Sequence, residues 1–437
     1  MANDVPQRRL SDVADLRGGY AFRSRDYTDH GHFVLRTINI REDGSIVHEG
    51  ATFISEELAS EHSRFELEPV DTLFVMVGAT LGKVGFVKDC DLPALLNQNM
   101  WVIRSKDKKE THPRYLNYWF QWKVKETLHW ASGSARGFVR RDDYRNLEFP
   151  SISYQEQCAI VSFLGSLEDK IELNRRMNVL LEQIARAIFK AWFIDFEPVK
   201  AKAAGATSFP GMSQYVFDQL PGTFVNSELG RIPAGWDVIP IGELIQVVGG
   251  GTPSTKNPGF WDGGVHPFCT PKDMSRLRSP VLLHTERHIT DAGVNKISSG
   301  QLPVGTVLLS SRAPLGYLAI ARTPVSVNQG IIAMLTGEIP DSYILMWTKA
   351  SMEAIKSRAG GSTFAEISKR NFRPISALRP DNVSLQAFGA IVDPSFDLIA
   401  ANEQETGVLE TTRDTLLPKL ISGEISVPVV NGGGDSE

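Results

Sequence analysis

Short runs of cationic, hydroxyl and amide side chains lie beside glycine-rich segments at several places in the chain. The clearest is the loop at residues 133–137, Gly-Ser-Ala-Arg-Gly, with Arg140 and Arg141 shortly after it. Guanidinium, ammonium, hydroxyl and amide groups are the donors that proteins use on phosphate oxygens and on the edges of DNA bases. These runs therefore predict loops that contact a nucleic acid. The candidate contact residues are Arg36, Asn39, Arg41, Thr80, Lys83, Ser134, Arg136, Arg140, Arg141, Lys272, Ser310, Ser311, Arg312, Ser362, Thr363, Lys369 and Arg370.

Each candidate has an ordinary alternative when it is taken singly, because polar side chains on loops are mostly solvated surface residues. Two further pairs, Asn97-Gln98 and Asn328-Gln329, occur at matching places in the two halves of the chain. Two recognition surfaces of different specificity would differ at such positions. We therefore expect these shared pairs to serve the scaffold.

Three segments resemble catalytic or metal motifs, and each departs from its pattern. The segment GATLGK at 78–83 is one residue shorter than a phosphate-binding loop, and Val84 replaces the Ser or Thr that would hold Mg²⁺. DPSF at 393–396 lacks the second proline of the amino-methyltransferase motif. His284 and His288 are four residues apart but have no third ligand nearby. We expect no catalytic residue, no metal and no cofactor on this chain.

Composition excludes several classes of protein. With 437 residues, 42% of them hydrophobic and 22% charged, the chain is expected to form several globular domains. No stretch approaches the roughly 18–20 apolar residues that cross a bilayer. The N-terminus has no secretory core, and three widely spaced cysteines give no disulfide framework or zinc site. These features predict a cytoplasmic protein.

The net charge of −5 weakens a nucleic-acid function. Proteins that bind duplex DNA through its phosphates usually carry a basic stripe or patch. Contact with DNA would have to come from local clusters of cations, or from partner subunits that supply positive charge.

The chain repeats itself once, at an offset of roughly 230 residues. The segment DTLFVMVGATLGKVGFV at 71–87 matches GTVLLSSRAPLGYLAI at 305–320, and the two Asn-Gln pairs follow in the same order. Short β-branched and aromatic runs, broken by Gly, Pro, Asn and Asp, begin each half. Such runs are typical of a mixed α+β domain.

Each half ends in one long helix with a heptad stripe. The seam residues are Ile160, Leu164, Leu167, Ile171, Asn174, Leu181, Ile188, Ile399, Asn402, Leu409, Leu416 and Leu420. Two helices with matching seams can pair, and a polar residue on each seam sets the register at some cost in stability. The alternative is that each helix packs only on its own domain. Pro394 is expected to kink or restart the second helix, and Pro418 to weaken its last turn.

The fold class expected is α+β, with two globular mixed α/β domains in tandem, each followed by a long helix, and with the two helices paired as an antiparallel coiled coil. The expected segments are a first domain over 1–152, a helix over 153–196, a linker over 197–236, a second domain over 237–382, a helix over 383–424 and a flexible tail over 425–437.

This order of segments resembles the specificity subunits of type I restriction-modification enzymes over almost the whole chain. LNRRMNVLLEQIARAIFKAWFIDFEPV at 173–199 is similar to the central conserved region of that family. FVNSELGRIPAGW at 224–236 is similar to its lead into the second domain, and LLPKLISGEISV at 416–427 to its C-terminal end.

The resemblance implies a non-catalytic subunit with two target-recognition domains, each of which reads one half of a bipartite, asymmetric site in double-stranded DNA. It also implies two methyltransferase (modification) subunits and restriction/translocase subunits as partners. S-adenosylmethionine, ATP and Mg²⁺ would be bound by those partners.

Two other functions stay open at this point. A self-contained methyltransferase or nuclease would need cofactor or metal motifs, which the sequence lacks. A coiled-coil scaffold whose globular domains bind protein rather than DNA would suit the acidic composition.

Overall fold

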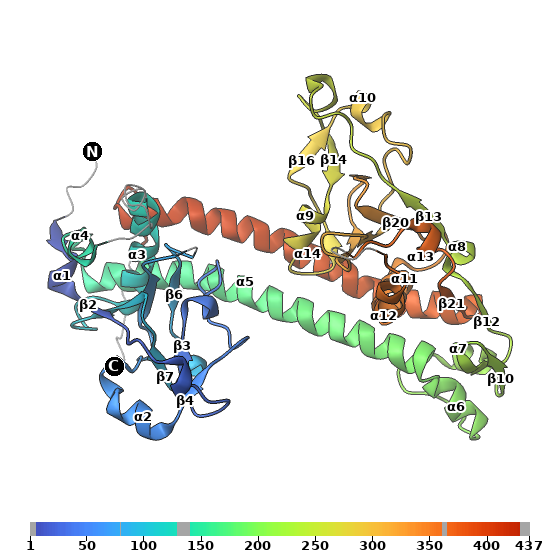
Figure 1. Cartoon of the computed structure of the whole chain (residues 1–437), viewed down its shortest axis with the longest axis horizontal. Helices are drawn as coiled ribbons and strands as arrows, with labels where there is room; N and C mark the ends of the chain where they lie inside the picture. Colours follow the sequence, from blue (N-terminus) through green and yellow to red (C-terminus); the bar gives the residue numbers. More distant parts are fainter. Residues whose placement is uncertain (1–5, 79, 129–139, 361–364, 429–437) are drawn as a thin grey trace, which may run out of the picture. The chain divides into compact units, whose positions relative to one another are not determined.

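The chain divides into two compact units that both include parts of the long helices (Figure 1). The computed structural model describes residues 6–78, 80–128, 140–360 and 365–428. Unit 1 comprises residues 1–169 and 409–437, and unit 2 comprises residues 170–408. Each unit therefore contains one globular domain and a section of both helices.

Unit 1 is built from two small sheets and a strand pair. The strand order is β2-β8-β5-β6 in the four-stranded sheet and β4-β3-β7 in the three-stranded sheet, and β1 pairs with β9. The strands are β1 Gln7–Arg9, β2 Ala14–Gly18, β3 His32–Leu35, β4 Phe53–Ile54, β5 Thr72–Val75, β6 Val84–Phe86, β7 Ala94–Leu96, β8 Met100–Ser105 and β9 Glu148–Pro150. The helices of the globular part are α1 Leu10–Val13, α2 Glu56–Glu61, α3 Pro113–Thr127 and α4 Arg141–Arg145.

One hydrophobic core of unit 1 lies between the four-stranded sheet and α3. Proline occupies the first position of α3, where its missing N–H group leaves no hydrogen bond unmade. Phe120 of α3 is fully buried and meets Phe74 of β5 edge-to-face, with ring centroids 5.4 Å apart. Aromatic burial of this kind holds the helix against the sheet.

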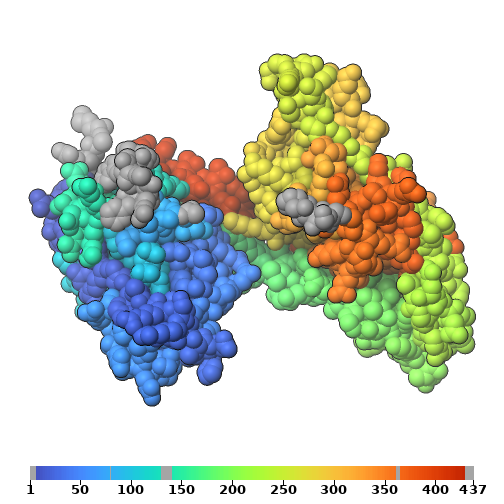
Figure 2. Space-filling view, in the orientation of Figure 1, coloured from blue at the N-terminus to red at the C-terminus, as the bar shows by residue number. Residues whose placement is uncertain are grey.

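Unit 2 repeats this strand order, which confirms the tandem repeat at the level of topology. Its five-stranded sheet runs β13-β20-β17-β18-β15, its three-stranded sheet runs β16-β14-β19, and β12 pairs with β21. The strands are β12 Asp237–Pro240, β13 Gln246–Gly249, β14 His266–Cys269, β15 Val281–Leu282, β16 Arg287–Ile289, β17 Val307–Ser310, β18 Leu318–Ala321, β19 Ser326–Val327, β20 Ile331–Leu335 and β21 Ser376–Arg379. The helices of the globular part are α8 Ile241–Leu244, α9 Pro271–Ser275, α10 Asp291–Val294, α11 Asp341–Ala350, α12 Met352–Ser357 and α13 Lys369–Phe372. Strands β14 and β16, together with α10, project from the rest of unit 2 (Figures 1 and 2).

The segment 197–236, expected to be a linker, is a folded part of unit 2. It forms α6 Glu197–Ala203, α7 Gln214–Gln219 and the antiparallel pair β10 Phe224–Ser227 and β11 Gly230–Pro233. Phe217 and Trp236 are buried in the same core as the sheet. The indole N–H of Trp236 donates to the carboxylate of Asp381 at 2.8 Å. Because the segment is rich in Ala, Gly and Pro, its composition suggested a linker and did not reveal these buried aromatic residues.

The two long helices are α5 Tyr154–Phe189, which continues into a π-turn at 190–194, and α14 Asn382–Ile421. α14 passes through Pro394 without interruption, so the restart expected there does not occur. Pro394 is exposed, and water can therefore satisfy the carbonyl group that loses its helical partner. Among the described residues, α14 is the one helix long and apolar enough to cross a membrane, with a mean hydropathy of 1.2 over a window that is 44% buried. The sequence scan expected no such segment.

Candidate nucleic-acid interface

In unit 2, three loops meet at one end of the five-stranded sheet. Gly250, just after β13, lies so close to the turn after β19 that a Cβ atom on it would be 1.8 Å from the carbonyl oxygen of Val327. The N–H of Gly251 donates to this same oxygen at 3.0 Å. The N–H of Ser311, directly after β17, donates to the carbonyl of Gly330 at 2.8 Å.

The same contacts recur in unit 1. A Cβ on Gly19 would be 2.0 Å from the carbonyl oxygen of Asn97. The N–H of Tyr20 donates to Leu96 at 3.0 Å, and the N–H of Met76 donates to Asn99 at 3.1 Å. We call this arrangement the loop surface of each unit. It consists of residues 18–20, 76–78, 80–83 and 97–99 in unit 1 and of residues 249–252, 311–316 and 328–330 in unit 2.

Two predicted contact residues lie at the loop surface of unit 2. The Nε atom of Arg312 is 3.5 Å from the position that a Cβ on Gly330 would take, and the Nζ atom of Lys369 is 3.0 Å from the corresponding position on Gly249. The side chain of Arg312 is 37% exposed and forms an ion pair of 3.7 Å with Glu366. A guanidinium has five N–H donors, so this pair leaves donors for a ligand. The structure thus brings two cations to the same end of the sheet.

The neighbouring polar residues complete this surface. Thr252 donates to the Oε1 atom of Gln329 at 2.6 Å and so fixes an exposed amide on the surface. Arg370 is exposed on α13. The predicted contacts Ser362 and Thr363 lie outside the described residues.

In unit 1 the predicted cations are more dispersed. Lys83 forms an ion pair of 2.9 Å with Glu42 and also donates to the carbonyl of Ile40 at 3.3 Å. Thr80 is half-buried in the same turn, and Arg41 is an exposed residue between Ile40 and Glu42, both of which Lys83 contacts.

The other predicted cations of unit 1 that the structure describes lie on different elements. Arg140 and Arg141 are exposed at the start of α4, whereas Ser134 and Arg136 lie outside the described residues. Arg36 donates to the carbonyl of Gly50 at 2.9 Å.

Three of the residues predicted to contact DNA face the protein interior instead. Asn39 is fully buried; its carbonyl accepts the N–H of Arg36, and its amide donates to Val47 and Glu49. Ser310 is also fully buried: its hydroxyl donates to Pro314 at 2.8 Å and accepts the N–H groups of residues 316 and 317. Ser311 is 3% exposed. Side chains with these positions cannot reach a base edge.

Cations also lie on α9 and on β16 of unit 2. Lys272 and Arg276 both bind Glu286, at 3.0 and 2.7 Å, and the hydrogen bond from Lys272 lowers the pKa of that carboxyl group. Arg287 lies 3.6 Å from the ring centre of Trp261, which is the distance of a cation–π contact. Sequence reasoning missed this exposed guanidinium, because 26 positions separate it from the tryptophan and no local pattern connects them.

Within unit 2, buried polar side chains join α5 to α14. Asn174 donates to Glu405 at 2.8 Å, and Asn402 donates to the carbonyl of Asn178 at 2.8 Å. Asn178 donates in turn to Glu403 at 2.8 Å. The hydrogen bond from Asn174, followed by that from Lys170, lowers the pKa of Glu405. We call these contacts the polar layer.

The remaining seam residues are apolar and at least half-buried. Within unit 1, Ile160 and Leu164 share a core with Leu417 and Leu420. Buried seam residues are Ile160, Leu164, Ile171, Asn174, Ile399, Asn402 and Leu420, and half-buried ones are Leu167, Leu181, Ile188, Leu409 and Leu416. The sequence analysis overlooked Leu417 and Thr406, both of which are buried.

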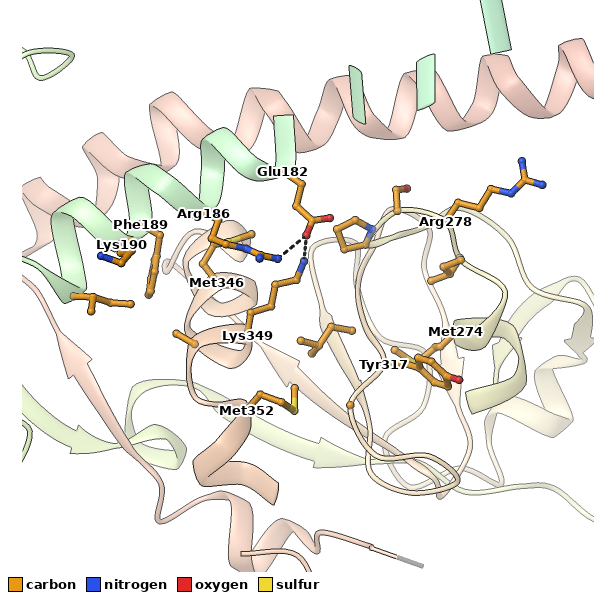
Figure 3. A pocket seen from close by; sticks show the side chains of 17 residues that line it. Glu182, Arg186, Phe189, Lys190, Met274, Arg278, Tyr317, Met346, Lys349 and Met352 are labelled. Atoms are coloured by element: carbon orange, nitrogen blue, oxygen red, sulfur yellow. Dashed lines mark hydrogen bonds and ion pairs between the residues drawn. The ribbon is translucent and has the colours of Figure 1, made fainter. Parts of the chain in front are cut away.

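A cavity of about 600 Å³ lies between α5, α11 and the loop after α9, all within unit 2. Its walls are mostly apolar, with Phe189, Met346 and Met352 among the lining residues. Figure 3 shows Lys349 and Arg186 directed at Glu182 on its edge, at 2.6 and 3.3 Å. The pair from Lys349 ties the globular part of unit 2 to α5, whereas Arg186 and Glu182 are both residues of α5. No group of three or more His, Cys, Asp or Glu that could hold a metal ion exists in the described part of the chain.

Comparisons with a family model and with individual known proteins point to the same family. A family model for the type I restriction modification DNA specificity domain matches residues 3–183 and 233–376. The type I restriction enzyme MjaIX specificity subunit of Methanocaldococcus jannaschii is 36% identical over 190 residues, which are 43% of this chain and 44% of that protein. The match thus spans less than half the length of this relative. The HindI specificity subunit of Haemophilus influenzae is 28% identical over 318 residues, covering 62% of this chain and 67% of that protein.

A solved structure shares the fold. The S subunit of the type I restriction-modification system from M. genitalium superposes with a TM-score of 0.59 at 16% identity, covering 96% of this chain and 97% of that chain. The family model covers well over half of the sequence, in both halves of the repeat. The chain therefore belongs to the family of type I restriction-modification DNA specificity subunits.

Proposed function

We propose that this chain recognises a bipartite, asymmetric sequence in double-stranded DNA and brings methyltransferase and restriction subunits to it in the cytoplasm. The chain is the specificity component of such a complex and not a catalytic one. Each loop surface reads one half of the site, and the long helices set the spacer between the halves.

The observation that carries this proposal is the repetition of one loop arrangement with different side chains. In both units the same close glycine contact and the same backbone hydrogen bonds join the three loops. The turn after β5 carries Thr80 and Lys83, whereas the turn after β17 carries Arg312. Because base edges differ in their donors and acceptors, surfaces with different side chains prefer different sequences.

We also propose that α5 and α14 pair as an antiparallel coiled coil. Contacts within unit 2 support this, because they run in opposite order along the two helices: Lys170 meets Glu405, and Asn178 meets Asn402 and Glu403. Helices of 36 and 40 residues extend roughly 54 and 60 Å at about 1.5 Å per residue. DNA rises about 3.4 Å per base pair, so such helices match the scale of a spacer of several base pairs.

The partners follow from this assignment. Two methyltransferase subunits would dock on the two halves of the repeat, and restriction/translocase subunits would join them. S-adenosylmethionine, ATP and Mg²⁺ would be bound by these partners and not by this chain. Their surfaces would supply the positive charge that a chain with a net charge of −5 lacks.

Mapping of methylated bases tests the function. The chain and its cognate methyltransferase subunit are expressed in a host without other DNA methylation, and the genome is read by long-read sequencing. A single split, asymmetric motif that disappears without this chain is the expected result. Methylation that persists unchanged without the chain would exclude the proposal and favour a scaffold that binds protein.

A further inference from the structure

Arg287, at the start of β16, is an exposed arginine whose guanidinium lies on the ring of Trp261, 3.6 Å from the ring centre. Within the described part of the chain, this guanidinium forms no ion pair and donates no hydrogen bond. Lys272 and Arg276 differ in this respect, because both pair with Glu286. The N–H donors of Arg287 therefore remain available for a ligand.

Trp261 holds this guanidinium in place. The indole N–H of Trp261 donates to the carbonyl of Ser254 at 3.1 Å, and the indole ring meets the ring of Phe268 edge-to-face, with centroids 5.3 Å apart. Phe268 is 1% exposed and pairs with Arg287 across β14 and β16. The tryptophan is thus fixed to the core of the projection. A cation–π contact with a fixed ring restricts the arginine side chain, so less entropy is lost when that side chain binds a ligand.

Arg287 also lies near the loop surface of unit 2. Strand β14, the partner of β16, leads into Pro271, whose Cγ atom is 3.1 Å from the position that a Cβ on Gly330 would take. The Nε atom of Arg312 is 3.5 Å from that same position. Three positions along the chain separate Pro271 from Phe268, the residue opposite Arg287, and they span at most about 10 Å at roughly 3.3 Å per residue. DNA rises about 3.4 Å per base pair, so both arginines lie within the span of one half-site.

The equivalent position in unit 1 carries a different side chain. Strands β4 and β16 occupy the same place in the two three-stranded sheets, and each contains an isoleucine, Ile54 or Ile289, that pairs with a histidine. Two positions before these isoleucines stand Thr52 in unit 1 and Arg287 in unit 2. A position with a shared backbone and different side chains suits a residue that distinguishes bases, because the two units would then prefer different sequences.

We infer that Arg287 is a specificity-determining residue of unit 2 that donates two hydrogen bonds to a guanine, and that Trp261 is its positioning residue. The inference rests on the proposed function and names one residue that reads the half-site of unit 2. The paired donors of a guanidinium match the O6 and N7 acceptors that guanine presents in the major groove. A lysine has no such planar pair of donors, so arginine and lysine are not equivalent in this role.

Two variants of Arg287 test the contact with guanine. Arg287→Ala removes all the donors, whereas Arg287→Lys keeps the charge and loses the planar pair. Each full-length chain is expressed with the cognate methyltransferase subunit, and its methylated motif is mapped. Methylation rates on duplexes with a single base pair replaced then measure discrimination. We expect both variants to relax one G·C pair of one half-site, with discrimination there about ten- to hundred-fold lower and the other half-site unchanged.

Variants of Trp261 test the positioning role. Trp261→Leu should relax the same G·C pair to a smaller extent, because the guanidinium loses the ring that orients it. Trp261→Phe keeps an aromatic face and should retain most of the discrimination. A purely structural role for Trp261 would instead relax the whole half-site, or leave the Leu and Phe variants alike.

Several outcomes would overturn the inference while the proposed function stands. These are an unchanged motif in Arg287→Ala, full discrimination in Arg287→Lys, relaxation at an A·T pair, and an equal loss of binding over all sequences, which would make Arg287 a phosphate contact. Failure of the proposed function is different, because the unchanged chain would then specify no motif. Equal circular dichroism spectra and urea midpoints show that the Arg287 variants fold.

Discussion

At the scale of single residues, the glycine after β13 is required by the backbone that lies against it. We expect Gly250→Ala to lower the free energy of unfolding by about 2–4 kcal/mol, because the new Cβ would collide with the backbone at Val327 and not with a movable side chain. Gly251→Ala is the matched control, since nothing lies within 4 Å of its Cβ position. Urea unfolding of both variants measures the difference. Equal stability of the two would show that the loops do not meet as described.

Arg312 lies partly exposed at the loop surface of unit 2 and is our candidate for a residue that reads a base. We expect Arg312→Ala to relax the methylated motif in one half-site only, by about 1–3 kcal/mol of discrimination at the affected base pair. Arg379→Ala removes an exposed arginine that pairs with Asp237 on the distant β12–β21 strands, and should leave the motif unchanged. Methylation mapping provides the measurement. A uniform loss at all sites would instead make Arg312 a phosphate contact.

The type of a residue did not reveal which way its side chain points. Asn39 and Ser310 were chosen because amide and hydroxyl groups can read bases, yet both satisfy backbone groups of their own turns. Short polar side chains compete for local backbone groups in this way, and a single sequence does not show which partner prevails. Arg312, with a longer side chain, reaches past the backbone to the surface.

At the scale of elements, the polar layer of α5 and α14 should cost stability while it fixes register. We expect Asn402→Ala to destabilise the chain by about 1–3 kcal/mol, because it leaves the carbonyl of Asn178 without its buried donor. Replacing both Asn178 and Asn402 by Leu should restore or exceed the original free energy of unfolding. A double-mutant cycle by urea unfolding measures the coupling. If the double variant loses as much as the two single variants together, the residues act independently.

The elements themselves were largely predictable from periodicity. The heptad spacing of Ile160, Leu164 and Ile171 predicted a long helix, and the repeat predicted two domains of matching topology, as the strand orders show. The segment 197–236 could not be predicted in the same manner. Its anchors Phe217 and Trp236 bury through contacts with distant parts of unit 2, and no local period records such contacts.

At the scale of the whole molecule, the length of the helices should set the spacer of the DNA site. Insertion of four residues into both α5 and α14, after Asp169 and after Val408, would lengthen each by roughly 6 Å and advance its phase by about 40°. At about 3.4 Å per base pair the added length corresponds to about two base pairs, and at roughly 34–36° per base pair the added phase corresponds to about one, so we expect a spacer longer by about one to two base pairs. We expect both half-sites to stay unchanged, because the loop surfaces are untouched.

Methylation mapping decides the outcome, with insertion into α5 alone as the control. That control should abolish recognition, because α5 can no longer keep both the register of Asn178 with Asn402 and the packing of Ile160 and Leu164 on Leu417 and Leu420. Altered half-sites with an unaltered spacer would show that the helices do not measure the site.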